Sequence, residues 1–173
     1  MYIGSFNTGS YEFPQTTIWD GYLKPNPRMF SLGANFAICD YARFYLWPYD
    51  TQTEPYERVI FEAGDDVWIS HGFEATINDK LTIGAKTIIG AHVLITGGNH
   101  VFDRRDIPIK DQGYVGEELR IGSGAWVGSN VSILKGAHIG DGAIIGTGSV
   151  LTKPTGDFEV WGGNPAVKIQ DRP

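Results

Sequence analysis

The side chains best suited to chemistry in this sequence are its four histidines. Imidazole titrates close to neutral pH, so a histidine can take a proton from a reacting hydroxyl group during catalysis. His100 follows Asn99 and directly precedes a charged stretch at 101–120, which makes it the histidine nearest to a candidate functional loop. His92 and His138 lie in turn-like positions of a repeat, and we expect both to be solvent-exposed turn residues.

Cysteine content and charge exclude several classes of protein. Cys39 is the only cysteine, which rules out an intramolecular disulfide and a cysteine-rich zinc site, and we expect it to be a small buried residue. The net charge of −6 argues against binding to nucleic acid or to an anionic membrane surface. The first residues lack the features of a signal peptide, and no apolar run is long enough to span a membrane. The expected location is cytoplasmic.

A repeat of six residues organises most of the chain. From position 121 the sequence divides into IGSGAW, VGSNVS, ILKGAH, IGDGAI, IGTGSV and LTKPTG, and each block opens with Ile, Val or Leu. The same frame runs upstream from AGDDVW at 63 and ISHGFE at 69, through the longer block ATINDKLT at 75, to IGAKTI at 83, IGAHVL at 89 and ITGGNH at 95. A fainter copy lies at LGANFA and ICDYAR, from position 32. The repeat therefore predicts a regular architecture over most of the chain.

A period of six does not fit an α-helix, whose apolar stripe returns every three or four residues. It fits a short strand followed by a tight turn, and three such blocks make one triangular coil of a parallel β-helix. Glycine at the second position of many blocks is expected to accept turn dihedrals that a Cβ would resist. The predicted fold is all-β, with about five coils and an aliphatic column pointing inward: Ile83, Ile89, Ile95, Ile121, Val127, Ile133, Ile139 and Ile145.

Two stretches break the period and should leave the coil as excursions. One is rich in proline and aromatic residues, at 45–59, and the other is the charged stretch at 101–120. Residues 1–30 are aperiodic and are predicted to form an N-terminal extension. The remaining residues, 31–173, are predicted to form one β-helix domain, with the excursions as the places where function concentrates.

The blocks, together with GTGSVLTK at 146–153 and GGNPAVKI at 162–169, resemble the hexapeptide-repeat acyltransferases. The closest resemblance is to the sugar and polysaccharide O-acetyltransferase branch, which includes galactoside and maltose acetyltransferases. The resemblance implies a left-handed β-helix, a homotrimer and acetyl-CoA in a cleft between adjacent subunits. It also implies direct transfer of acetyl from acetyl-CoA to a hydroxyl group of a sugar or polysaccharide precursor, without a metal and with His100 as general base.

The resemblance assigns further residues to acetyl-CoA. Trp126 would flank the thioester, and the backbone amide near Ser129 would face the thioester oxygen. A chain with net charge −6 needs fixed cations for the CoA phosphates, and two lysines are the candidates. In the C-terminal stretch at 162–169, the lysine stands one position later than in the family's pattern, at Lys168. The residues expected along the pantetheine arm and the nucleotide are Thr147, Gly148, Thr152, Lys153 and Lys168.

On the acceptor side, the resemblance points to His71, Asp79 and Asn99. Where galactoside-type enzymes carry a Tyr-x-Asn stretch that holds the sugar, this chain has Ser70, His71 and Gly72, which argues against a simple galactoside as acceptor. Two alternatives remain for His71: it is a structural or exposed residue, or it lines the acceptor side. Asp79 matches an acidic acceptor-side residue, and an ordinary turn aspartate is an equal alternative.

Other functions use the same coil. An N-acetyltransferase acting on an amino sugar, or an antibiotic-modifying acetyltransferase, would need the same histidine. A zinc-dependent carbonic anhydrase needs three histidine ligands that include a pair five positions apart, and the histidines here contain no such pair. A β-helix that serves only as a scaffold is the remaining alternative.

Overall fold

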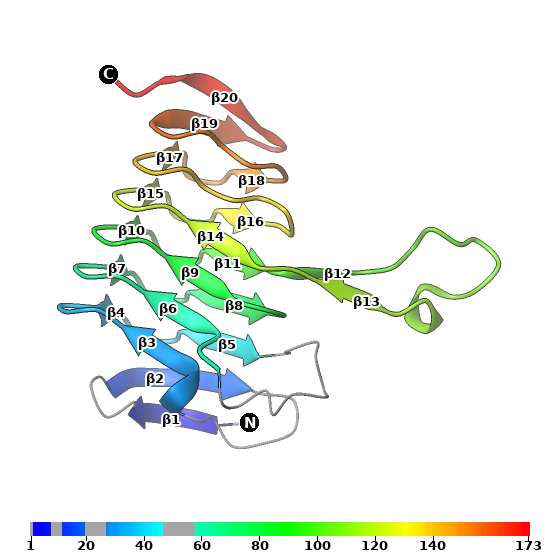
Figure 1. Ribbon diagram of the computed structural model, residues 1–173, viewed down its shortest axis with the longest axis horizontal. Coiled ribbons are helices and arrows are strands. Elements are labelled where there is room, and N and C mark those ends of the chain that lie inside the picture. The colour runs from blue at the N-terminus through cyan, green and yellow to red at the C-terminus, as the bar shows by residue number, and fades with distance from the viewer. Residues whose placement is uncertain (1, 8–11, 20–26, 47–57) are drawn as a thin grey trace.

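The hexapeptide blocks form stacked coils in the computed structural model, which describes residues 2–7, 12–19, 27–46 and 58–173. Three sheets run along the stack, one for each side of a triangular coil, and their strands are parallel except for one antiparallel pair at each end of the stack. Figure 1 shows the coils one above another, with β1 (Tyr2–Asn7) at one end of the stack and β20 (Ala166–Asp171) at the other. The predicted left-handed parallel β-helix is confirmed.

Two of the sheets contain seven strands each, and the third contains four. The first comprises β1 (Tyr2–Asn7), β2 (Glu12–Trp19), β5 (Arg43–Leu46), β8 (Glu74–Ile77), β11 (Leu94–Thr96), β16 (Ser132–Ile133) and β18 (Val150–Leu151). The second comprises β4 (Ala37–Ile38), β7 (Trp68–Ile69), β10 (Ile88–Ile89), β15 (Trp126–Val127), β17 (Ile144–Ile145), β19 (Glu159–Gly163) and β20 (Ala166–Asp171). The third comprises β3 (Phe30–Leu32), β6 (Phe61–Ala63), β9 (Leu81–Ile83) and β14 (Leu119–Ile121).

A two-stranded antiparallel sheet leaves the stack between the third and fourth coils. It pairs β12 (Gly98–His100) with β13 (Tyr114–Gly116), and Figure 1 shows this hairpin projecting away from the coils. Within the described ranges, helical structure is confined to two short 3-10 segments, η1 (Pro27–Met29) and η2 (Ile109–Asp111), the second of them in the hairpin loop. None of the helices in these ranges could cross a membrane.

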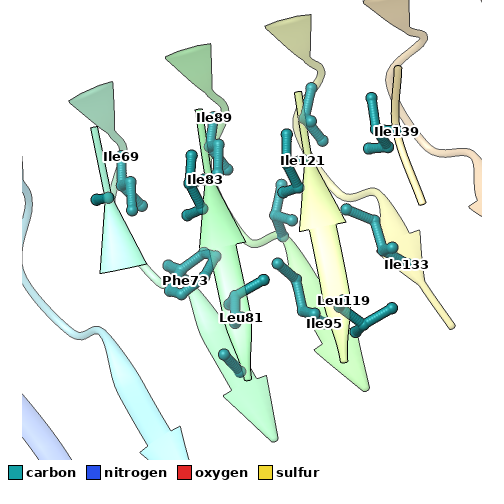
Figure 2. Close-up of a cluster of buried hydrophobic side chains, with 14 of the residues drawn as sticks. Ile69, Phe73, Leu81, Ile83, Ile89, Ile95, Leu119, Ile121, Ile133 and Ile139 are labelled. Atoms are coloured by element: carbon teal, nitrogen blue, oxygen red, sulfur yellow. The ribbon is translucent and has the colours of Figure 1, made fainter. Parts of the chain in front are cut away.

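The aliphatic column predicted from the repeat lies in the centre of the coils. All eight of its members are at most 2% exposed, and Figure 2 shows Ile83, Ile89, Ile95 and Ile121 pointing into the interior. Register explains the stacking, because Ile69, Ile89, Val127 and Ile145 are direct partners in successive strands of one sheet. The burial of an aliphatic side chain at every rung stabilises the stack.

Near the N-terminal end the faint copy of the repeat forms a complete coil of β3, β4 and β5. Its interior is aromatic: the Phe44 ring lies 5.1 Å from Phe61 and 5.7 Å from Phe73, between ring centroids. Wider side chains fill the coil here in place of the isoleucines above it. One parallel strand pair, β2 with β5, continues the first sheet beyond this coil.

Glycine at the second position of a block has a different cause from the one expected. Gly122 does not have a positive φ, whereas Gly124, at the fourth position, has φ +64°. A Cβ on Gly122 would lie 2.5 Å from the backbone nitrogen of Asp141 in the next coil. The second position is therefore glycine because neighbouring coils approach each other closely there, and the left-handed turn belongs to the fourth position.

The bounds of both excursions differ from the sequence prediction. Residues 45 and 46 belong to β5, and residues 47–57 lie outside the described residues. The charged excursion begins at Gly98 and its hairpin ends at Gly116, because 119–121 pair with β9 as part of the next coil.

Candidate active site

The hairpin presents His100 to solvent. His100 pairs with Tyr114 across the two strands, and Asn99, also exposed, pairs with Val115. The imidazole of His100 lies against the Tyr114 ring with centroids 5.0 Å apart and an interplanar angle of 85°. The strand pairing thus fixes which aromatic ring the candidate base contacts.

A buried asparagine supports this pair from the coil beneath. Asn78 is only 2% exposed, and the Tyr114 hydroxyl donates to its Oδ1 at 3.4 Å. Burial raises the pKa of the Tyr114 hydroxyl, partly offset by this hydrogen bond. Sequence reasoning did not identify either residue as part of the site. The available signal was the extended block at 75–82, which holds Asn78 where the ordinary repeat has no room for it.

Ser129 lies at a corner of the fourth coil, stacked on the corner that contains Thr147 and Gly148. The Gly148 N–H donates to the Ser129 carbonyl at 2.9 Å, and the Ser129 hydroxyl accepts from the Ala91 N–H at 3.2 Å. The Ser129 N–H makes no hydrogen bond to another residue of the described ranges. At the equivalent position of another corner, the Ser123 N–H donates a hydrogen bond to the Asp141 carboxylate at 2.8 Å. The Ser129 amide is therefore a donor without a partner among the described residues.

Trp126 lies on the outer surface of the second sheet. It is 53% exposed, and its strand partners on either side are Ile88 and Ile144. Trp68 follows in the same row, beyond Ile88, and is 51% exposed. These side chains form a continuous apolar strip on the coil surface.

The two candidate lysines differ in their surroundings. Lys153 lies with its ammonium 5.4 Å from the centre of the Trp161 ring, and it forms no ion pair with a carboxylate of the described residues. Lys168 donates to Glu159 at 2.8 Å and to Asp171 at 2.7 Å, and these bonds raise the pKa of its ammonium. The charge of Lys168 is already matched within the chain, whereas the described carboxylates leave that of Lys153 unmatched.

Glu159 is the centre of this C-terminal cluster. It accepts from the Lys168 ammonium, from the Trp161 indole at 2.8 Å and from the Gly156 N–H at 2.7 Å. These donors, with Lys168 the largest contributor, lower the pKa of the Glu159 carboxyl to about 2. The ion pair of Glu159 with Lys168 connects β19 to β20. Thr152, another candidate residue, lies exposed just after β18.

The other histidines lie on different parts of the coil. His71 and His92 contact each other edge to face at one corner, with ring centroids 4.8 Å apart, and both are exposed. His138 is only partly exposed, contrary to expectation, because its Nδ1 accepts from the Arg120 N–H at 3.1 Å. Asp79 forms an ion pair with Arg58 at 2.8 Å.

Two further findings concern metal and thiol chemistry. Cys39 is partly exposed and not fully buried as expected, since it lies where β4 ends and a coil corner begins. The part of the chain that the structure describes contains no group of three or more His, Cys, Asp or Glu side chains placed to hold a metal ion.

One copy of the chain does not bring all the candidate residues together. In Figure 1 the hairpin that carries His100 projects from one side of the stack, and β7, β10 and β15, with Trp126, lie on the opposite side. His100 is grouped with Asn78 and Tyr114, whereas Ser129 is grouped with Thr147 and Gly148.

Comparison with known proteins agrees with this fold. The family described as bacterial transferase hexapeptide (six repeats) matches residues 119–153, which confirms the predicted resemblance to the hexapeptide-repeat transferases. A probable acetyltransferase of Mycobacterium tuberculosis, Rv3034c, is 31% identical in an alignment of 117 residues, and the match covers 60% of this chain. The chain spans 39% of that relative's length.

Solved structures extend the likeness to nearly the whole chain. A galactoside acetyltransferase in complex with coenzyme A is 26% identical, with a TM-score of 0.67 over 83% of this chain and 66% of that one. A variant of AntD, an N-acyltransferase from Bacillus cereus in complex with a dTDP-amino sugar and coenzyme A, is 13% identical, with a TM-score of 0.72 over 99% of this chain and 92% of that one. The second likeness concerns the fold alone.

Proposed function

We propose that this chain is an acetyl-CoA-dependent O-acetyltransferase that acetylates a hydroxyl group of a sugar or polysaccharide precursor. The observation that carries the proposal is His100, exposed at the base of a hairpin that leaves a hexapeptide-repeat coil. The names of the relatives support it, since the mycobacterial relative is called a probable acetyltransferase and the galactoside acetyltransferase was solved with coenzyme A.

The proposed chemistry is direct acyl transfer with His100 as general base. The imidazole takes the proton of the acceptor hydroxyl while the hydroxyl oxygen attacks the carbonyl carbon of the thioester. The resulting tetrahedral intermediate collapses, the carbon–sulfur bond breaks, and the CoA sulfur leaves as the thiol after receiving the proton. The open Ser129 N–H supplies a donor of the kind that stabilises the oxyanion of such an intermediate.

The proposal includes a homotrimer, because His100, in the hairpin that follows β11, and Ser129, between β15 and β16, lie at different corners of one coil stack. A cleft between adjacent copies would join the hairpin of one copy to the coil surface of the next. Contact between copies would also cover part of the apolar strip around Trp126, which is half exposed in the single chain. Exposed apolar strips of this kind favour association.

For acetyl-CoA, we assign Trp126 and the Ser129 amide to the thioester end. Lys153 suits a CoA phosphate, since the described carboxylates leave its charge unmatched, and the cation helps a chain of net charge −6 to hold an anion. Lys168 is the weaker candidate, since Glu159 and Asp171 already hold it. The remaining contacts proposed for the arm and nucleotide are those of Thr147, Gly148 and Thr152.

His71, Asp79 and Asn99 are proposed for the acceptor side. Asn99 is the strongest of the three, because it neighbours His100 on the same strand. Asp79 adjoins Asn78, which supports the hairpin, and its ion pair with Arg58 makes this side of the coil polar. Such a surface favours a hydroxyl-rich acceptor.

The test combines an acceptor panel with a matched pair of variants. Purified protein is assayed with acetyl-CoA against free sugars, nucleotide sugars, amino sugars and oligosaccharides, and release of CoA thiol is measured. His100→Asn is expected to lower kcat by about 10² to 10⁴, the usual contribution of a general base. His92→Asn is the control, because asparagine accepts the left-handed backbone at φ +55°.

Full activity of His100→Asn would refute the assignment of the base, and His71 would be the next candidate. Activity on amino sugars alone would replace O-acetylation by N-acetylation. If no CoA binding is detected by thermal shift, the scaffold alternative is favoured.

A further inference from the structure

The base of the hairpin is built around Asn78. Gly98 and Gly116 face each other at the first pair of the hairpin, and both lie against the Asn78 side chain. A Cβ on Gly98 would lie 2.8 Å from Asn78 Oδ1, and one on Gly116 would lie 2.3 Å from Asn78 Cβ. The hairpin can seat this closely only because both positions lack a side chain.

Backbone hydrogen bonds attach the same base to the coil. The Gly97 N–H donates to the Thr76 carbonyl at 2.9 Å, and the Glu117 N–H donates to the Gly97 carbonyl at 2.9 Å. Asn78 follows β8, so the hairpin and its support belong to adjacent coils. The position of the first hairpin pairs is thus set by the β-helix itself.

Tyr114 connects this support to His100. Its hydroxyl contacts Asn78 Oδ1, while its ring meets the His100 imidazole at an angle of 85°. Because Asn78 is 2% exposed, it cannot readily move away from the hydroxyl. The tyrosine is therefore held at one end by the coil and at the other touches an exposed histidine.

We propose that Tyr114 is a positioning residue that, anchored by Asn78, holds the His100 imidazole in the orientation that catalysis requires. The inference rests on the proposed function. His100 needs such a contact because it is exposed and its ring forms no hydrogen bond with any residue in the described ranges. An imidazole that turns freely spends most of its time away from any bound acceptor.

The expected effect follows from the side-chain torsions of histidine. Free rotation over three χ1 wells and two χ2 orientations leaves one arrangement populated about one-sixth of the time. Loss of the Tyr114 ring should therefore lower kcat by about 3- to 6-fold. The KM for acetyl-CoA should not change, because Tyr114 takes no part in binding it.

The experiment compares Tyr114→Leu with Tyr114→Phe. The leucine variant removes the ring, whereas the phenylalanine variant keeps the ring and loses only the hydroxyl that contacts Asn78, so it should lower kcat less than the leucine variant does. Phe102→Leu is the matched control, since it also replaces an aromatic residue by leucine, at an exposed position of the same excursion. Tyr114→Met is a second ring-free variant, and it fills the same space if leucine destabilises the hairpin.

A second readout does not depend on enzymatic activity. The Tyr114 ring current should shift the His100 imidazole signals in an NMR spectrum of histidine-labelled protein, with His100→Asn used to identify them. The shift should disappear in Tyr114→Leu and Tyr114→Met and persist in Tyr114→Phe and Phe102→Leu. This spectrum tests the contact even if no acceptor is acetylated, so failure of this inference and failure of the proposed function are distinguishable.

Unchanged His100 signals in the folded ring-free variants would overturn the inference. So would a wild-type kcat in those variants, or an equal fall in Phe102→Leu. A fall in kcat that accompanies a higher KM for acetyl-CoA would also refute it, since it would assign Tyr114 to substrate binding.

Discussion

Replacement of Gly116 by alanine should separate the function of the hairpin from the stability of the coils. The added Cβ would lie 2.3 Å from Asn78 Cβ, whereas carbon atoms in contact lie about 3.5 to 4.0 Å apart. The clash therefore requires a movement of about 1.2 Å or more. Asn78 Cβ is attached directly to the backbone of a buried residue, so the hairpin has to move instead.

The movement should carry His100 with it. Gly116 ends β13, the strand that begins with Tyr114, and Tyr114 touches the imidazole. A misplacement of about 1 Å at a reacting group can lower the rate by about 100-fold, and we expect a loss of that order in kcat. Overpacking should also cost about 1 to 3 kcal/mol, which lowers Tm by several degrees and leaves the coils folded at assay temperature.

The assay measures kcat well below Tm, and amide hydrogen exchange then locates the change. Faster exchange should be confined to the hairpin and to the segment that supports it. Gly113→Asn is the control on the same hairpin: its Cβ has no atom within 4 Å, and asparagine accepts a positive φ better than most residues. A wild-type kcat for Gly116→Ala, or an equal loss in Gly113→Asn, would refute the reasoning.

Two further predictions concern the C-terminal region. Lys153→Ala should raise the KM for acetyl-CoA by about 5- to 30-fold if its ammonium holds a CoA phosphate, while Lys168→Ala should have the smaller effect; unchanged KM values in both would assign them to solvent. Because the pKa of Glu159 is lowered from 4.5 to about 2, its stabilisation is present above the ordinary value and is lost as pH falls between these limits. Glu159→Gln should flatten the dependence of Tm on pH in that interval, and an unchanged curve would contradict it.

The repeat alone determined the architecture. A six-residue period with an aliphatic residue at each block start can bury those residues only in stacked coils, and all eight predicted members of the column are buried. The same reasoning located the charged excursion and the histidine at its start. Family resemblance supplied the handedness of the coil, which periodicity does not contain.

Tertiary structure decided which distant residues meet. Tyr114 and Asn78 are 36 positions apart, and their contact depends on how one coil and a hairpin of the next fit together. Likewise, the pairing of Lys168 with Glu159 depends on the register of β19 with β20, which no motif encodes. A local repeat specifies which side chains point inward, whereas contacts between outward side chains depend on the relative placement of whole coils.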